Sequence, residues 1–104
     1  MSKKWEVLYD DSVGPIEDGD IRHSCRVDTD EDWCPTINGQ LTLSVIRSKH
    51  DLMYRICIWG GDDFGMEKDY KLYRNTFKKV KEEADAIPEP ITEEWLKQNG
   101  FVYA

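Results

Sequence analysis

The chain has 104 residues, of which 21 are acidic and 14 are basic, and its formal net charge at pH 7 is −7. This length fits one domain spanning residues 1–104. The negative charge disfavours direct binding to nucleic acid, which usually requires a basic patch. No apolar run approaches the roughly 20 residues of a transmembrane helix, and no apolar segment of signal-peptide type follows the N-terminus. We therefore expect a cytoplasmic protein that does not bind membranes.

Four segments in the first 60 residues have the composition of strands: 5–9, 21–27, 41–46 and 52–59. In segment 52–59, one face is uniformly apolar and should meet the core: Leu52, Tyr54, Ile56 and Ile58. The other face has a mixed composition: Met53, Arg55, Cys57 and Trp59. The mixed set fits either a partly covered surface or a binding face. Trp59 is therefore a candidate contact for a partner.

Acidic side chains are concentrated in segment 6–32, which holds ten of them against two arginines. Its last part contains four acidic residues followed by a tryptophan: Asp28, Asp30, Glu31, Asp32 and Trp33. Acidic surfaces attract basic partners, and aromatic side chains often anchor interfaces. The pattern predicts a site for a protein with a basic surface, such as a nucleic-acid-binding groove. The alternatives are that the acids only keep the protein soluble and that Trp33 packs on the sheet edge.

Metal binding is not expected from the known ligand spacings. The run that begins at Asp28 resembles the start of an EF-hand, but Trp33 replaces the glycine at the sixth position and Gly39 replaces the glutamate at the twelfth. The three cysteines and two histidines also lack the spacing of a zinc site. We expect no cofactor, and we expect the thiols to be reduced.

The sequence Gly60-Gly61-Asp62-Asp63 interrupts the fourth strand and is typical of a hairpin turn. It also resembles the G-G-D-E-F turn of nucleotide cyclases and polymerase palms, in which carboxylates hold a divalent metal. That chemistry needs a larger domain and further acidic ligands, so we favour the turn and regard Asp62 and Asp63 as partner contacts. A metal-dependent nucleotide enzyme that uses these two aspartates stays as an alternative.

The segment after the turn has two interpretations. Alternation over 64–72 predicts a return strand, whereas an apolar stripe from Met66 to Ile87 fits a continuous helix. We favour a strand followed by a helix that starts at Asn75 or Thr76 and ends at Ile87, and then a short helix over 92–100. The predicted fold is α+β: an antiparallel meander of four to five strands, with one longer helix and a short C-terminal helix packed on one face.

Two pieces, I-W-G-G-D-D-F-G-M-E-K-D-Y and I-P-E-P-I-T-E-E-W-L-K-Q-N-G-F, lie within residues 56–101. Together they resemble short phage- or prophage-encoded proteins of unassigned function. The resemblance implies no catalytic residue. It implies a context, the cytoplasm of a host cell, in which small acidic phage proteins often block restriction, CRISPR or DNA-repair enzymes.

Serines and histidines occur near one another, as at Ser24 and His23, but in no known nucleophile motif, so we do not expect an enzyme. The leading hypothesis is an anti-defence inhibitor that occupies the basic surface of a host or defence protein. The alternative within the class of binding proteins is an immunity protein or antitoxin that neutralises one toxin.

Overall fold

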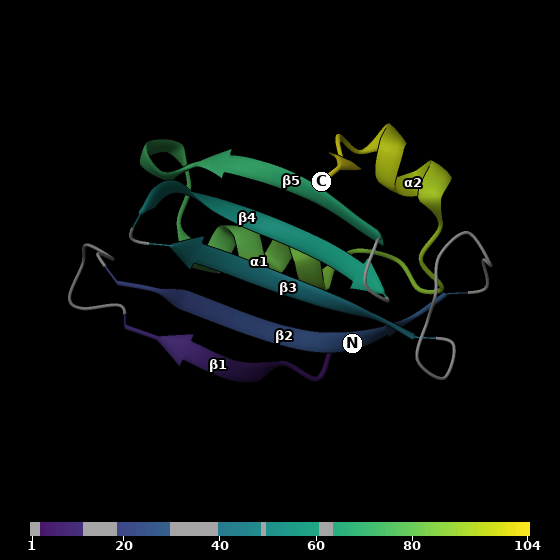
Figure 1. Cartoon of the computed structure of the whole chain (residues 1–104), viewed down its shortest axis with the longest axis horizontal. Helices are drawn as coiled ribbons and strands as arrows, with labels where there is room; N and C mark the ends of the chain where they lie inside the picture. Colours follow the sequence, from purple (N-terminus) through teal and green to yellow (C-terminus); the bar gives the residue numbers. More distant parts are fainter. Residues whose placement is uncertain (1–2, 12–18, 30–39, 49, 61–63) are drawn as a thin grey trace.

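The computed structural model describes residues 3–11, 19–29, 40–48, 50–60 and 64–104. They form a six-stranded antiparallel sheet in which the strands follow their order in the chain (Figure 1). The strands are β1 (Glu6–Asp10), β2 (Ile21–Asp28), β3 (Gln40–Ser48), β4 (Asp51–Gly60), β5 (Phe64–Lys71) and β6 (Val102–Tyr103). A 3-10 turn, η1 (Leu72–Arg74), and two helices, α1 (Phe77–Asp85) and α2 (Glu93–Gln98), complete the described chain.

The core lies between one face of the sheet and helix α1, which contacts β3 and β4. Leu43 marks its centre, because it pairs with Cys25 of β2 and with Ile58 of β4 and is fully buried. From α1, the buried side chains are Phe77, Val80 and Ala84, the 3-4 spacing of one helix face. Helix α2 lies near the β5–β6 edge (Figure 1) and contributes the buried Leu96.

Local sequence signals account for both helices. The Thr76 hydroxyl accepts a hydrogen bond of 3.2 Å from the main-chain N–H of Lys79, and Thr92 accepts one of 3.2 Å from Trp95. After α2, Gly100 has a φ of 89°, a conformation that side chains with a Cβ disfavour. No helix of the described chain is long and apolar enough to cross a membrane.

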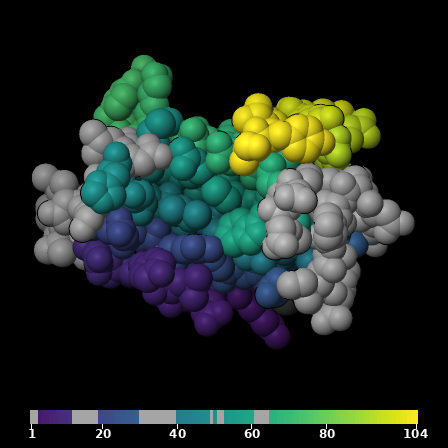
Figure 2. All heavy atoms as spheres, viewed as in Figure 1, coloured from purple at the N-terminus to yellow at the C-terminus, as the bar shows by residue number. Residues whose placement is uncertain are grey.

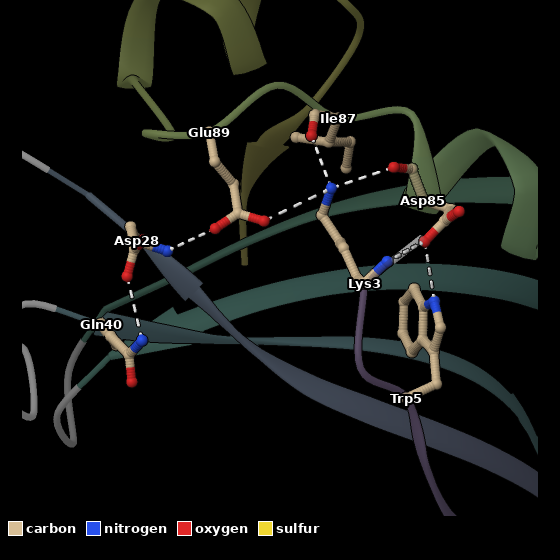
Figure 3. A network of polar contacts seen from close by, with 7 residues as sticks. All are labelled: Lys3, Trp5, Asp28, Gln40, Asp85, Ile87 and Glu89. Atoms are coloured by element: carbon tan, nitrogen blue, oxygen red, sulfur yellow. Dashed lines mark hydrogen bonds and ion pairs between the residues drawn. The ribbon is translucent and has the colours of Figure 1, made fainter. Parts of the chain in front are cut away.

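The N-terminal segment is fixed across the end of α1 (Figure 3). The Lys3 ammonium donates to the main-chain oxygens of Asp85 at 3.0 Å and Ile87 at 2.7 Å, and lies 3.6 Å from the Glu89 carboxylate. The Trp5 indole N–H donates to the Asp85 carboxylate at 3.0 Å. A cation is favourable here because carbonyl groups at the end of a helix carry partial negative charge.

The prediction of four to five strands was wrong, because the sheet has six. The additional strand is β6, where Met66 pairs with Tyr103 and Glu67 with Val102. Two residues are too few to show the alternation by which a strand is recognised in a sequence. Pairing at this edge depends on the reversal of the chain after α2.

The two interpretations of the segment after the turn are resolved in favour of the strand. Residues 64–71 form β5, and α1 begins only after the Thr76 cap. Helix α1 ends at Asp85, two residues earlier than the predicted Ile87. Ile87 is nevertheless buried in the core, which explains why it continued the apolar stripe.

Candidate functional site

The face of the sheet opposite α1, here called the open face, brings side chains of β1 to β5 together in rows. Figure 2 views the molecule from this side. Strand pairing defines three rows: Arg22, Ile46, Arg55 and Asp69; Glu6, Ser24, Ser44, Cys57 and Glu67; and Arg26, Thr42, Trp59 and Gly65. Because side chains alternate along a strand, the residues between these positions face the core. The described part of the open face is therefore largely polar and charged, and its large aromatic side chains include Trp59 of β4 and Tyr9, the β1 partner of Arg22.

A hollow of about 430 Å³ lies on the open face. It is lined by residues of β1 to β4 and of the N-terminal segment: Lys4, Glu6, Leu8, Arg22, Ser24, Cys25, Arg26, Thr42 and Trp59. Three of these side chains are cationic and one is anionic. The charge of the hollow is thus opposite in sign to the net charge of the whole chain, −7.

Arg22 and Trp59 form one wall of the hollow. The guanidinium carbon of Arg22 lies 5.2 Å from the centre of the Trp59 ring, within the range of a cation–π interaction. The Nε atom of Arg22 is buried, and no hydrogen-bond acceptor among the described residues contacts it. A buried charged donor without an acceptor is costly. This atom is the most notable unsatisfied group of the open face.

Hydroxyl groups form the floor of the hollow. The Oγ atoms of Ser24 and Ser44 lie 2.5 Å apart, and both residues are buried. Beside them, the Arg26 guanidinium donates a hydrogen bond of 3.0 Å to the Thr42 hydroxyl. The second of these contacts holds the Arg26 side chain beside the serine hydroxyl groups.

Beyond the hollow, the open face continues as an ion-paired surface. Arg55 of β4 lies 2.6 Å from the Asp69 carboxylate and 3.5 Å from the Glu67 carboxylate, both on β5. Between Arg55 and the hollow lies Cys57. Burial, and next the nearby Glu67 carboxylate, raise the pKa of the Cys57 thiol to about 11. The thiol is therefore protonated at neutral pH and is a poor nucleophile.

Of the eight residues predicted to bind a partner, only Asp28 and Trp59 lie in the described chain. Asp28 is the exposed last residue of β2, and its carboxylate accepts a hydrogen bond of 2.9 Å from Gln40. Arg26 and Trp59 both pair with Thr42 and so lie on one face. Asp28 is two residues after Arg26 on β2, so its side chain points to that same face. Its partner Gln40 is likewise two residues from Thr42 on β3. The two residues thus share one face and one end of the sheet. The other six lie outside the described residues: Asp30, Glu31, Asp32, Trp33, Asp62 and Asp63.

The sequence reasoning missed the cations of the hollow. In segment 21–27, alternation gives Ile21 and Val27 one face, which the structure buries, and it gives Arg22 and Arg26 the opposite face. The alternation therefore contains a signal for both arginines, although the net charge of the whole chain is negative. The contribution of Lys4 had no local signal, because it depends on the path of the N-terminal segment along β2.

His23 lies on the core face and is not part of the open face. The Lys81 ammonium can only donate, so the His23 Nδ1 atom accepts its hydrogen bond of 3.0 Å, and the Nε2–H group faces the Asp10 carboxylate at 3.3 Å. Burial, and next the Lys81 charge, lower the pKa of His23, whereas Asp10 opposes this effect. These contacts describe a neutral histidine that stabilises the fold.

Metal-binding chemistry is not evident in the described residues, which include no group of three or more histidine, cysteine or acidic side chains able to hold an ion. No protein-family model, curated protein sequence or solved structure matches this chain.

Proposed function

We propose that this protein is a non-enzymatic binding protein that inhibits its partner by occupying a basic surface. The observation that carries this proposal is the position of Asp28 and Trp59 at one end of the open face. An acidic residue and a large aromatic residue at the same end can give a partner both electrostatic attraction and an apolar contact. The acidic residues at 30–32 continue the chain directly from this point.

Charge defines the partner that this end of the sheet would bind. A basic groove that normally holds nucleic acid attracts an acidic protein over long range, which increases the rate of association. The likeness to small phage-encoded proteins favours a host or defence enzyme that acts on nucleic acid. Occupation of the groove would exclude the nucleic acid and so inhibit the enzyme.

The experiment is an affinity capture from host lysate that compares two variants with the same change in charge. Asp30→Asn/Glu31→Gln/Asp32→Asn alters the predicted site, whereas Glu82→Gln/Glu83→Gln/Glu94→Gln alters exposed acids on the two helices. We expect a nucleic-acid enzyme to be captured by the wild type and by the helix variant but to be depleted with the site variant. Raising the ionic strength from about 0.05 M to about 0.5 M should release it, because salt screens exposed charges.

A partner that both variants retain equally, at low and at high salt, would contradict the electrostatic contact. The substitution Trp59→Ala then tests the apolar contact separately. Purified partner and its nucleic-acid substrate give the functional measurement. Inhibition by the wild type that excess nucleic acid fails to relieve would contradict occupation of the groove.

A further inference from the structure

We propose that the hollow on the open face is a binding site for the phosphate group of a small phosphomonoester, of the size of a mononucleotide. The site is formed by Lys4, Arg22 and Arg26 around the serine floor, with Trp59 as the apolar wall. This inference does not depend on the proposed inhibition of a partner, because it concerns a different class of ligand and, apart from Trp59, different side chains.

The hollow carries a net positive charge. Its lining contains three cations and a single carboxylate, that of Glu6. No ion pair between Arg22 or Arg26 and a carboxylate is found in the described part of the chain, in contrast to Arg55 in the neighbouring rows. Converging cations without paired carboxylates raise the local concentration of anions.

The guanidinium groups of Arg22 and Arg26 are both held in place by neighbouring side chains. Arg22 is held on the Trp59 ring, and its buried Nε lacks an acceptor among the described residues. Arg26 is held by the Thr42 hydroxyl through Nη1, which uses one of the five N–H donors of a guanidinium. Two oriented guanidinium groups match the oxygens of a phosphate better than flexible lysines do.

Size and overall charge define the class of ligand. A volume of about 430 Å³ exceeds that of a lone phosphate ion and lies within the range of small-molecule sites, roughly 300–1,000 Å³. Leu8 and Trp59 offer apolar surface for the remainder of the ligand. An extended nucleic acid is disfavoured, because its further phosphates would meet a protein whose net charge is −7.

The test is an NMR titration of the full chain with AMP, inorganic phosphate, adenosine and acetate. We expect AMP to give saturable shifts of the Trp59 indole N–H and the Arg22 Nε–H signals, with inorganic phosphate binding more weakly and adenosine and acetate not binding at millimolar concentrations. Arg26→Gln and Lys4→Gln should each weaken AMP binding by about tenfold, the effect of one charge-assisted hydrogen bond. Arg26→Lys should weaken it less than Arg26→Gln.

The matched control is Lys79→Gln, which removes one charge from the exposed side of α1 and should leave AMP binding unchanged. Thermal unfolding of each variant shows whether it is folded. The substitutions are placed at the exposed Lys4 and Arg26, because loss of Arg22 would also remove its contact with the Trp59 ring. The proposal is overturned if AMP gives no saturable shift, if acetate binds as tightly as AMP, or if Lys79→Gln weakens binding as much as Arg26→Gln.

Discussion

The ammonium group of Lys3 donates a 2.7 Å hydrogen bond to the main-chain oxygen of Ile87 and thereby connects the N-terminal segment to the residues that follow helix α1. The Lys3 side chain is only 7% exposed, although it belongs to the first described residue. Its other contacts are the Asp85 main-chain oxygen and the Glu89 carboxylate. One buried cation thus satisfies carbonyl groups that helix α1 leaves without partners.

Replacing this cation should destabilise the fold. In Lys3→Met, the hydrocarbon stem is retained, but the carbonyl oxygens of Asp85 and Ile87 lose their donor. We expect the free energy of unfolding in urea to fall by ~1–3 kcal/mol. Lys4→Met is the control, because Lys4 is exposed and should change the free energy by less than about 0.5 kcal/mol. Equal effects of the two substitutions would contradict the role of Lys3.

The buried pair of Ser24 and Ser44 should show strong coupling. Ser44→Ala alone leaves the buried Ser24 hydroxyl without its partner at 2.5 Å, so we expect a loss of ~1–3 kcal/mol. In Ser24→Ala/Ser44→Ala, neither unsatisfied hydroxyl remains, and the loss should be smaller than in the single variant. Urea unfolding of both single variants and of the double variant completes the cycle. Additive losses would show that the two hydroxyl groups do not interact.

Leu43 should be the most sensitive core position of β3. It is fully buried between β2 and β4, and Leu43→Ala leaves a cavity in the centre of the sheet. We expect a loss of ~2–5 kcal/mol in the free energy of unfolding. Tyr73→Ala is the control, because Tyr73 is 73% exposed. Calorimetry of both variants tests the position of the core, which a small loss at Leu43 would contradict.

The lowered pKa of His23 predicts a specific dependence of stability on pH. In the folded protein His23 stays neutral below its ordinary pKa of about 6.5, whereas in the unfolded chain it binds a proton there. The stability that the neutral His23 contributes to the folded protein is therefore fully present above about pH 6.5 and is lost as the pH falls through the pKa of His23 in the folded state. Urea unfolding between about pH 7.5 and about pH 5 should show this loss.

The Lys81→Met variant tests the cause of this effect. Removing the ammonium group should raise the pKa of His23, because the Lys81 charge is one of the two causes that lower it. The carbon-bound ring protons of His23 report the pKa directly by NMR, and a His50→Gln background leaves a single histidine signal. An unchanged pKa in Lys81→Met would show that burial acts alone.

The extent to which the binding site could be predicted from the sequence differs among its residues. The alternation of 52–59 correctly placed Trp59 on the mixed face, and the pattern of 21–27 contained the information for Arg22 and Arg26. No local pattern could show that the Arg22 guanidinium would lie on the Trp59 ring, because β3 separates the two strands.

Patterns of neighbouring residues predict the strands with clear alternation, the starts of the two helices near Thr76 and Thr92, and the acidic character of the chain. The register between strands, the two-residue β6 and the burial of Lys3 depend on contacts between distant parts of the chain. Register depends on all the side chains of a face at once, because a slip of β2 by one residue would turn Ser24 and Arg26 toward the core. The cationic hollow is a consequence of this register, which explains why it forms on a protein whose net charge is negative.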